Sequence, residues 1–120
     1  MTYEQYNKFC GSLPATTGAD VWKVGGKVFA IGGWDDASSG KPRAAVTFKV
    51  SKIAFEMLKE EPGLRPAPYL ASRGMSWIQN YDKPGLSDRD LKAYIKESHR
   101  IVSLGLSKKK QKELGLNQDS

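Results

Sequence analysis

The sequence predicts one α+β domain with the element order α-β-β-β-α-β-β-α and a one-sided sheet. A Gly-Gly pair at residues 25–26 separates two apolar runs, a pattern typical of a tight antiparallel hairpin. Capped segments with one apolar stripe lie at both ends of the chain and are typical of helices that cover a sheet. The 120 residues, 39% hydrophobic and 27% charged, suit a single globular domain.

The first helix is predicted to start after Thr2, which forms a capping box with Gln5. Gly11 and Pro14 end it, and residues 14–20 are expected to be a polar connector. Cys10 lies on its apolar stripe. A buried small hydrophobe is favoured there over a reactive thiol, because no basic cluster flanks it.

Residues 21–33, VWKVGGKVFAIGG, are expected to fold back at the glycine pair and bring Trp22 opposite Phe29. Period-two alternation then predicts two faces. The inward face holds Trp22, Val24, Phe29 and Ile31, and the outward face holds Lys23, Val28 and Ala30.

The remaining elements follow from caps, breakers and alternation. Residues 34–42 read as a polar loop and 43–50 as a strand whose outer face includes Lys49. Ser51 and Ser87 cap two further helices, and Ser107 a short last one. The predicted inward positions of the second and third helices are Ala54, Met57 and Leu58, then Leu91, Ile95, Ser98 and Val102.

The segment at residues 62–77, PGLRPAPYLASRGMSW, is the most distinctive part of the sequence. Its prolines and glycines exclude a long helix, and its large side chains argue against a flexible linker. We expect a short strand at 64–67, a tight or single-turn segment at 69–73 and the last strand at 75–79.

A formal charge of +6 favours an anionic partner such as nucleic acid, although solubility alone also accounts for it. One cysteine and no signal-like or membrane-spanning run predict a cytoplasmic protein that is a monomer or weak dimer. The predicted nucleic-acid-binding residues are Lys23, Lys27, Lys49, Lys52, Arg65, Tyr69, Arg73 and Trp77. A core role is the alternative for Tyr69 and is favoured for Trp77, and the lysine cluster Lys108, Lys109, Lys110 and Lys112 is a second candidate.

Catalysis is not expected, and neither is a cofactor. The single histidine, His99, falls in the third helix and is interpreted as a surface residue. Asp35 and Asp36 lack further acidic ligands at fixed spacing. Phosphate-loop and dinucleotide motifs are absent from the sequence.

The order of LPATT, WKVGGKVFA, VTFKV, the 62–77 segment and ESHRIV resembles the MmcQ/YjbR family of small bacterial proteins, over residues 1–116. Residues 117–120 are left as a polar tail. The resemblance implies a two-layer, CyaY-like α+β domain with helices packed on one face of an antiparallel sheet, similar to secretion chaperones. It also implies DNA binding through a "double wing". A protein- or peptide-interaction module is the alternative.

Family members usually have an extended segment between the LPATT motif and the hairpin. Only residues 18–21 stand between Thr17 and Trp22 in this chain. We therefore expect the first edge strand to be largely missing, or its segment to be absent from this sequence, which would leave the hairpin edge unpaired.

Overall fold

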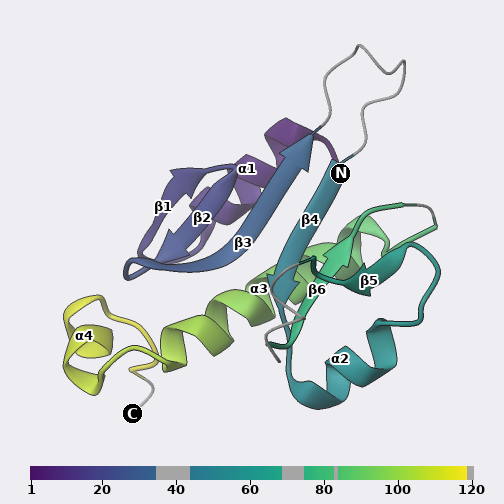
Figure 1. Ribbon diagram of the computed structural model, residues 1–120. Helices are drawn as coiled ribbons and strands as arrows, with labels where there is room; N and C mark the ends of the chain where they lie inside the picture. The colour runs from purple at the N-terminus through teal and green to yellow at the C-terminus, as the bar shows by residue number, and fades with distance from the viewer. Residues whose placement is uncertain (35–43, 69–74, 83, 119–120) are drawn as a thin grey trace.

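The computed structural model describes residues 1–34, 44–68, 75–82 and 84–118. The elements in chain order are α1 (Tyr3–Ser12), β1 (Thr16–Ala19), β2 (Val21–Val24), β3 (Lys27–Trp34), β4 (Ala44–Lys49), α2 (Lys52–Leu58), β5 (Leu64–Pro66), β6 (Trp77–Asn80), α3 (Asp88–Leu104) and α4 (Lys108–Glu113). The strands form one antiparallel sheet in the order β1-β2-β3-β4-β6-β5, with the helices on one face (Figure 1). The predicted α+β class is confirmed.

The expected connector at residues 14–20 is instead a short edge strand. β1 pairs with β2 from Thr16 opposite Val24 to Ala19 opposite Val21. Asp20 turns the chain between them with a left-handed φ of 64°. The strand escaped prediction because its residues TTGA are polar or small and largely exposed, so they show no apolar alternation. The edge strand is therefore present, although it has only four residues.

The hairpin turns at Gly25 and Gly26, both at positive φ, as predicted. The register of the hairpin shifts after two residue pairs from the turn, because Lys23 lies opposite Val28 but Trp22 lies opposite Ala30. Phe29 is the extra residue of this β-bulge. Trp22, Val24 and Phe29 are buried as expected.

The bulge reverses two predicted orientations further along β3. Ala30 is fully buried and lies opposite Phe48, so its prediction as an outward residue is wrong. Ile31 is only half-buried and lies opposite Thr47, on the other face from the core. A bulge residue that the sequence pattern does not reveal therefore exchanges the two faces from residue 30 onward.

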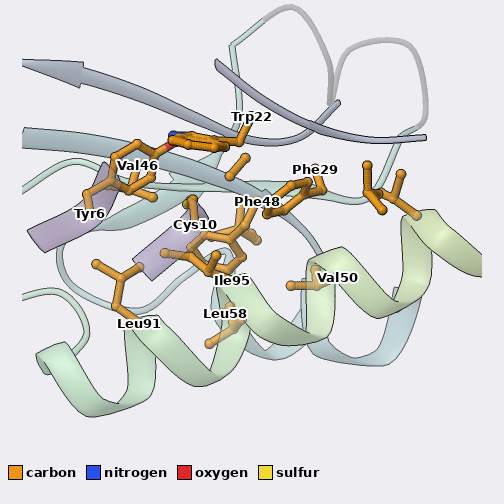
Figure 2. Packing of buried hydrophobic residues seen from close by; sticks show 14 of the residues in the cluster. Tyr6, Cys10, Trp22, Phe29, Val46, Phe48, Val50, Leu58, Leu91 and Ile95 are labelled. Atoms are coloured by element: carbon orange, nitrogen blue, oxygen red, sulfur yellow. The ribbon is translucent and has the colours of Figure 1, made fainter. Parts of the chain in front are cut away.

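The core lies between the sheet and the helices. Tyr6 and Cys10 of α1, Phe29 and Phe48 of the sheet and Ile95 of α3 are all fully buried within it (Figure 2). The predicted stripe of α3 is confirmed, since Leu91, Ile95, Ser98 and Val102 are at most 7% exposed. Met57 of α2 was predicted to point inward, but it is 67% exposed, because the short α2 contributes only Leu58 as a buried residue.

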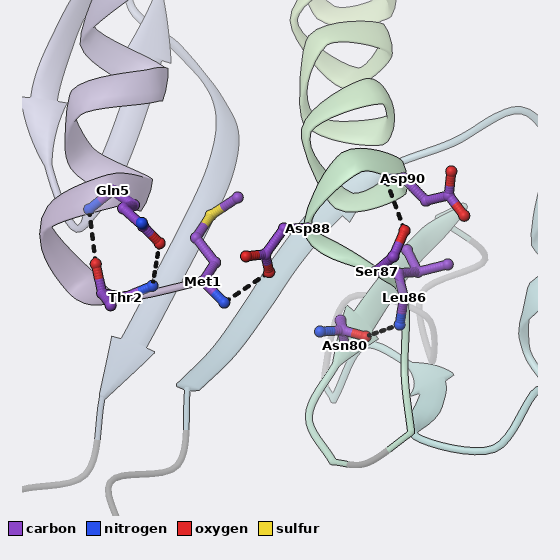
Figure 3. A network of polar contacts seen from close by, with 8 residues as sticks. All are labelled: Met1, Thr2, Gln5, Asn80, Leu86, Ser87, Asp88 and Asp90. Atoms are coloured by element: carbon purple, nitrogen blue, oxygen red, sulfur yellow. Dashed lines mark hydrogen bonds and ion pairs between the residues drawn. The ribbon is translucent and has the colours of Figure 1, made fainter.

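The helix starts follow the predicted caps. Thr2 and Gln5 form the reciprocal capping box of α1, and the Ser87 hydroxyl accepts from the Asp90 amide at 3.2 Å in α3 (Figure 3). The Met1 amine lies 2.7 Å from the Asp88 carboxylate, and this ion pair joins the residue before the α1 cap to the first turn of α3 (Figure 3). Among the described helices, none is long and apolar enough to cross a membrane.

Candidate nucleic-acid interface

The sheet face opposite the helices, called the open face below, has an unusual charge pattern. The six described strands carry the cations Lys23, Lys27, Lys49 and Arg65 and no Asp or Glu. The carboxylates of the described residues lie in helices, turns and loops. A sheet whose charged side chains are all positive attracts anions and repels cations.

Three of these cations share the open face. Lys23 alternates with the buried Trp22 and Val24, Lys49 follows the buried Phe48, and Arg65 follows the buried Leu64. In the strand order β1-β2-β3-β4-β6-β5 their strands are the second, fourth and sixth. Neighbouring strands lie about 4.8 Å apart, so successive cations are about 10 Å apart across the sheet.

Arg65 is the cation held most firmly. Its Nε donates to Gln79 Oε1 at 2.7 Å, and its guanidinium carbon lies 4.3 Å from the centre of the Tyr81 ring. Gln79 is directly opposite Arg65 in the β5–β6 pair. Stacking and one hydrogen bond orient the guanidinium, and its two terminal amino groups have no partner among the described residues. These groups can donate to two oxygens of one phosphate.

Lys27 and Lys52 are placed differently from the other predicted cations. Lys27 stands opposite the buried Val24, and its Nζ donates at 3.2 Å to the carbonyl oxygen of Gly105, at the end of α3. There it neutralises the negative end of the helix dipole. Lys52 begins α2 and is exposed, but it does not belong to the sheet.

Of the two aromatic residues in the 62–77 segment, the structure describes Trp77 but not Tyr69. Trp77 lies opposite Lys49 and is only 5% exposed, which confirms the interpretation of this residue as buried. Tyr69 and Arg73 lie outside the described residues, as does the predicted segment at 69–73. The strand predicted at 64–67 is confirmed as β5.

The lysine cluster of α4 is separate from the open face. Lys108, Lys109, Lys110 and Lys112 are exposed on a six-residue helix beyond the end of α3 (Figure 1). Its position relative to the sheet makes it a second cationic surface and not a continuation of the first.

His99 is buried, so its interpretation as a surface residue is wrong. It is 7% exposed, its Nε2 lies 2.8 Å from the carbonyl oxygen of Pro14, and its ring meets Phe29 edge-on. The α1–β1 connection covers this helix position, which periodicity alone does not indicate. Among the described residues, no three His, Cys, Asp or Glu side chains gather as metal ligands.

Sequence patterns missed the two residues that orient Arg65. Gln79 and Tyr81 lie 14 and 16 positions further along the chain and reach Arg65 only through the β5–β6 pairing. Gln79 belongs to the predicted last strand. Alternation within that strand indicates which face Gln79 lies on, but it does not indicate which residue of another strand lies opposite.

Burial raises the pKa of the Cys10 thiol to about 12, although a hydrogen bond with Tyr6 opposes the shift. From the ordinary value of 9.0, this lowers the thiolate fraction about a thousandfold at pH 8. We expect native protein to react with iodoacetamide at least about a thousand times more slowly than protein unfolded in urea. Equal rates in the two states would contradict the burial of Cys10.

The same pKa shift has a consequence for stability. The folded-state pKa of Cys10 lies above the unfolded value, so the neutral thiol contributes its full stabilisation below about pH 9. This contribution is lost as pH rises from about 9 toward 12, where the unfolded chain ionises first.

These features define a small α+β domain with a cationic open sheet face. The YjbR family model matches residues 7–101, and the chain belongs to that family, as the sequence motifs indicated. The crystal structure of the Deinococcus radiodurans protein DR2400, a DUF419 domain of the same family, has the same fold. Its TM-score is 0.76, with 21% sequence identity over 99% of this chain and 91% of that chain. No protein of curated function matches the sequence.

Proposed function

We propose that this protein binds nucleic acid by contacting backbone phosphates with its open face. The observation that carries the proposal is that its strands bear cations and no carboxylates, with Arg65 oriented by Gln79 and Tyr81. Phosphate contacts of this kind give affinity with little sequence preference. The formal charge of +6 adds long-range attraction to a polyanion.

Arg65 is the main anchor in this proposal, and Lys49 and Lys23 extend the contact across the sheet. An oriented guanidinium loses less side-chain entropy on binding than a free lysine does, and it donates two parallel hydrogen bonds. The lysines act as point charges toward neighbouring phosphates. Tyr69 and Arg73, which lie outside the described residues, stay predicted contributors.

Fluorescence anisotropy of a labelled random-sequence DNA duplex, titrated between 50 and 200 mM salt, tests the proposal. The logarithm of the binding constant should fall linearly with log salt, with a slope near −0.9 for each phosphate contacted. We expect Arg65→Ala to weaken binding about tenfold at low salt and to reduce the slope by about 0.9.

Arg89→Ala is the matched control, because Arg89 is an exposed arginine on α3 and has no partner among the described residues. It removes the same charge from the other side of the molecule. Equal effects of Arg65→Ala and Arg89→Ala, or no binding by the unaltered protein at 50 mM salt, would rule out the open face as the binding surface.

A protein-interaction module is the second candidate, and one observation favours it. Ile53 and Met57 of α2 are 76% and 67% exposed and lie one helical turn apart. The double variant Ile53→Ser, Met57→Ser separates the two functions in the same titration. The double variant keeps its DNA affinity if DNA binds to the open face. Loss of DNA binding would instead place the DNA contact on α2.

A further inference from the structure

A groove lies at the end of the sheet where β3 begins, β4 ends and β6 begins. Its volume is about 430 Å³, and the last turn of α3 closes one side. Lys27, Lys49 and Trp77 contribute to its wall from these three strands, and Ile101 and Gly105 from the helix end. A volume of this size lies in the range of small-molecule sites and is too small for a duplex.

The described wall is mostly apolar and carries positive charge alone. Ile31, Met75 and Ile101 supply apolar surface, and Lys27 and Lys49 supply two ammonium groups, with no carboxylate among the described lining residues. The Lys27 ammonium donates once, to the carbonyl oxygen of Gly105, and keeps two further donors. The Lys49 ammonium has no partner among the described residues. An anion with an apolar body matches this combination.

Trp77 supplies an independent observation. Its side chain is 95% buried, at 5% relative exposure, yet its indole Nε1 finds no acceptor in the described part of the chain. An unpaired buried donor destabilises a fold by about 1–3 kcal/mol unless something accepts its hydrogen bond. The indole ring is part of the groove wall, whereas its Nε1 is itself buried, so a ligand in the groove packs against the ring and changes the surroundings of the N–H.

We propose that the groove binds a small amphipathic carboxylate, such as an aryl- or alkyl-carboxylic acid. Its carboxylate oxygens accept from the Lys49 and Lys27 ammonium groups, and its apolar body packs on Ile31 and Met75. A sugar phosphate or nucleotide fits less well, because its hydroxyl groups would lie against apolar side chains without partners. The groove shares Lys49 with the open face, whereas Arg65 and Lys23 do not line it.

The test is an NMR titration of the ¹⁵N-labelled full chain with 4-phenylbutanoate. The neutral 4-phenylbutanamide and the cationic 4-phenylbutylamine have the same apolar body and serve as matched ligands. We expect a saturable shift of the Trp77 indole N–H signal, assigned by its loss in Trp77→Phe. Binding of the amide should be at least about tenfold weaker, and the amine should not bind.

Protein variants locate the charge that selects the ligand. Lys49→Gln is expected to weaken 4-phenylbutanoate binding about tenfold, and Lys27→Gln provides a second test if the first variant does not fold. Lys96→Gln is the control, because Lys96 is exposed on α3 and lies outside the groove. Equal affinity for the acid and the amide, equal effects of Lys49→Gln and Lys96→Gln, or no saturable shift at about 10 mM acid would overturn the proposal.

Discussion

Gly63→Ala is expected to lower the free energy of unfolding by about 3 kcal/mol or more. Gly63 has a φ of +88°, which an alanine adopts only with about 1–2 kcal/mol of strain. A Cβ at this position would also stand 2.3 Å from the carbonyl oxygen of Asp82 and 2.4 Å from the amide nitrogen of Gly85. Both neighbours are backbone atoms, so the clash is relieved only by moving the 80–86 turn.

Gly26→Ala is the matched control for this prediction. Gly26 has almost the same φ, +86°, but a Cβ there meets nothing within 4 Å. Its substitution measures the left-handed strain alone, and we expect a loss of about 1 kcal/mol. Urea denaturation of both variants gives the two free energies. Equal losses would show that the close approach at Gly63 does not determine its effect.

The close approach at Gly63 also bears on the candidate interface. The carbonyl oxygen of Gly63 accepts from the amides of Tyr81 and Asp82, and that of Pro62 accepts from the amide of Gly85. These bonds join the start of β5 to the turn after β6. The turn places the Tyr81 ring next to the Arg65 guanidinium, so Gly63, the second residue of the 62–77 segment, also positions the main cation of that segment.

Local patterns predicted the elements that depend on neighbouring residues. Thr2 and Gln5, Ser87 and the glycine pair at 25–26 each act within a few positions, and each forms the predicted cap or turn. Alternation predicted that Lys23 and Lys49 lie on the face away from the core, and the register confirms that face for both.

Features that depend on distant residues could not be predicted in the same way. The bulge at Phe29 has no local sequence signal, and it changed the expected faces of Ala30 and Ile31. The burial of His99 requires the carbonyl of Pro14, 85 positions away. Likewise, the orientation of Arg65 depends on the pairing of β5 with β6, which alternation within each strand does not specify.

The buried serine of α3, Ser98, bridges β3 and β4 where their pairing ends, next to the bulge. The last described pair of β3 and β4 at this end is Ala30 opposite Phe48, and one further step brings Phe29 opposite Lys49. Ser98 lies between these two backbones. Its hydroxyl accepts from the Lys49 amide at 2.8 Å and donates to the Phe29 carbonyl oxygen at 2.6 Å. A side chain of α3 thus bridges β3 and β4 just beyond their last described pair.

Ser98→Ala is therefore expected to lower the free energy of unfolding by about 2–4 kcal/mol. The substitution leaves an amide and a carbonyl without partners beneath a fully buried side chain, and each unpaired group destabilises by about 1–3 kcal/mol. Urea denaturation gives the total loss. Amide hydrogen exchange at Lys49 should accelerate more than at the neighbouring Phe48, because only the Lys49 amide loses its acceptor.

Ser103→Ala is the control within the same helix. Ser103 is equally buried, but its hydroxyl donates to the carbonyl of Arg100 in its own helix and accepts from Asn117, whose amide has a second acceptor in Gln111. Removing the Ser103 hydroxyl leaves no backbone group of a β-strand without a partner. We therefore expect Ser103→Ala to lower the free energy of unfolding by about 1 kcal/mol or less. If the two serine variants lost equal stability, or if exchange at Lys49 stayed unchanged in Ser98→Ala, the hydroxyl would not be bridging β3 and β4. A selective loss at Ser98 would mean that α3 holds the strand end from which Lys49 reaches both the open face and the groove.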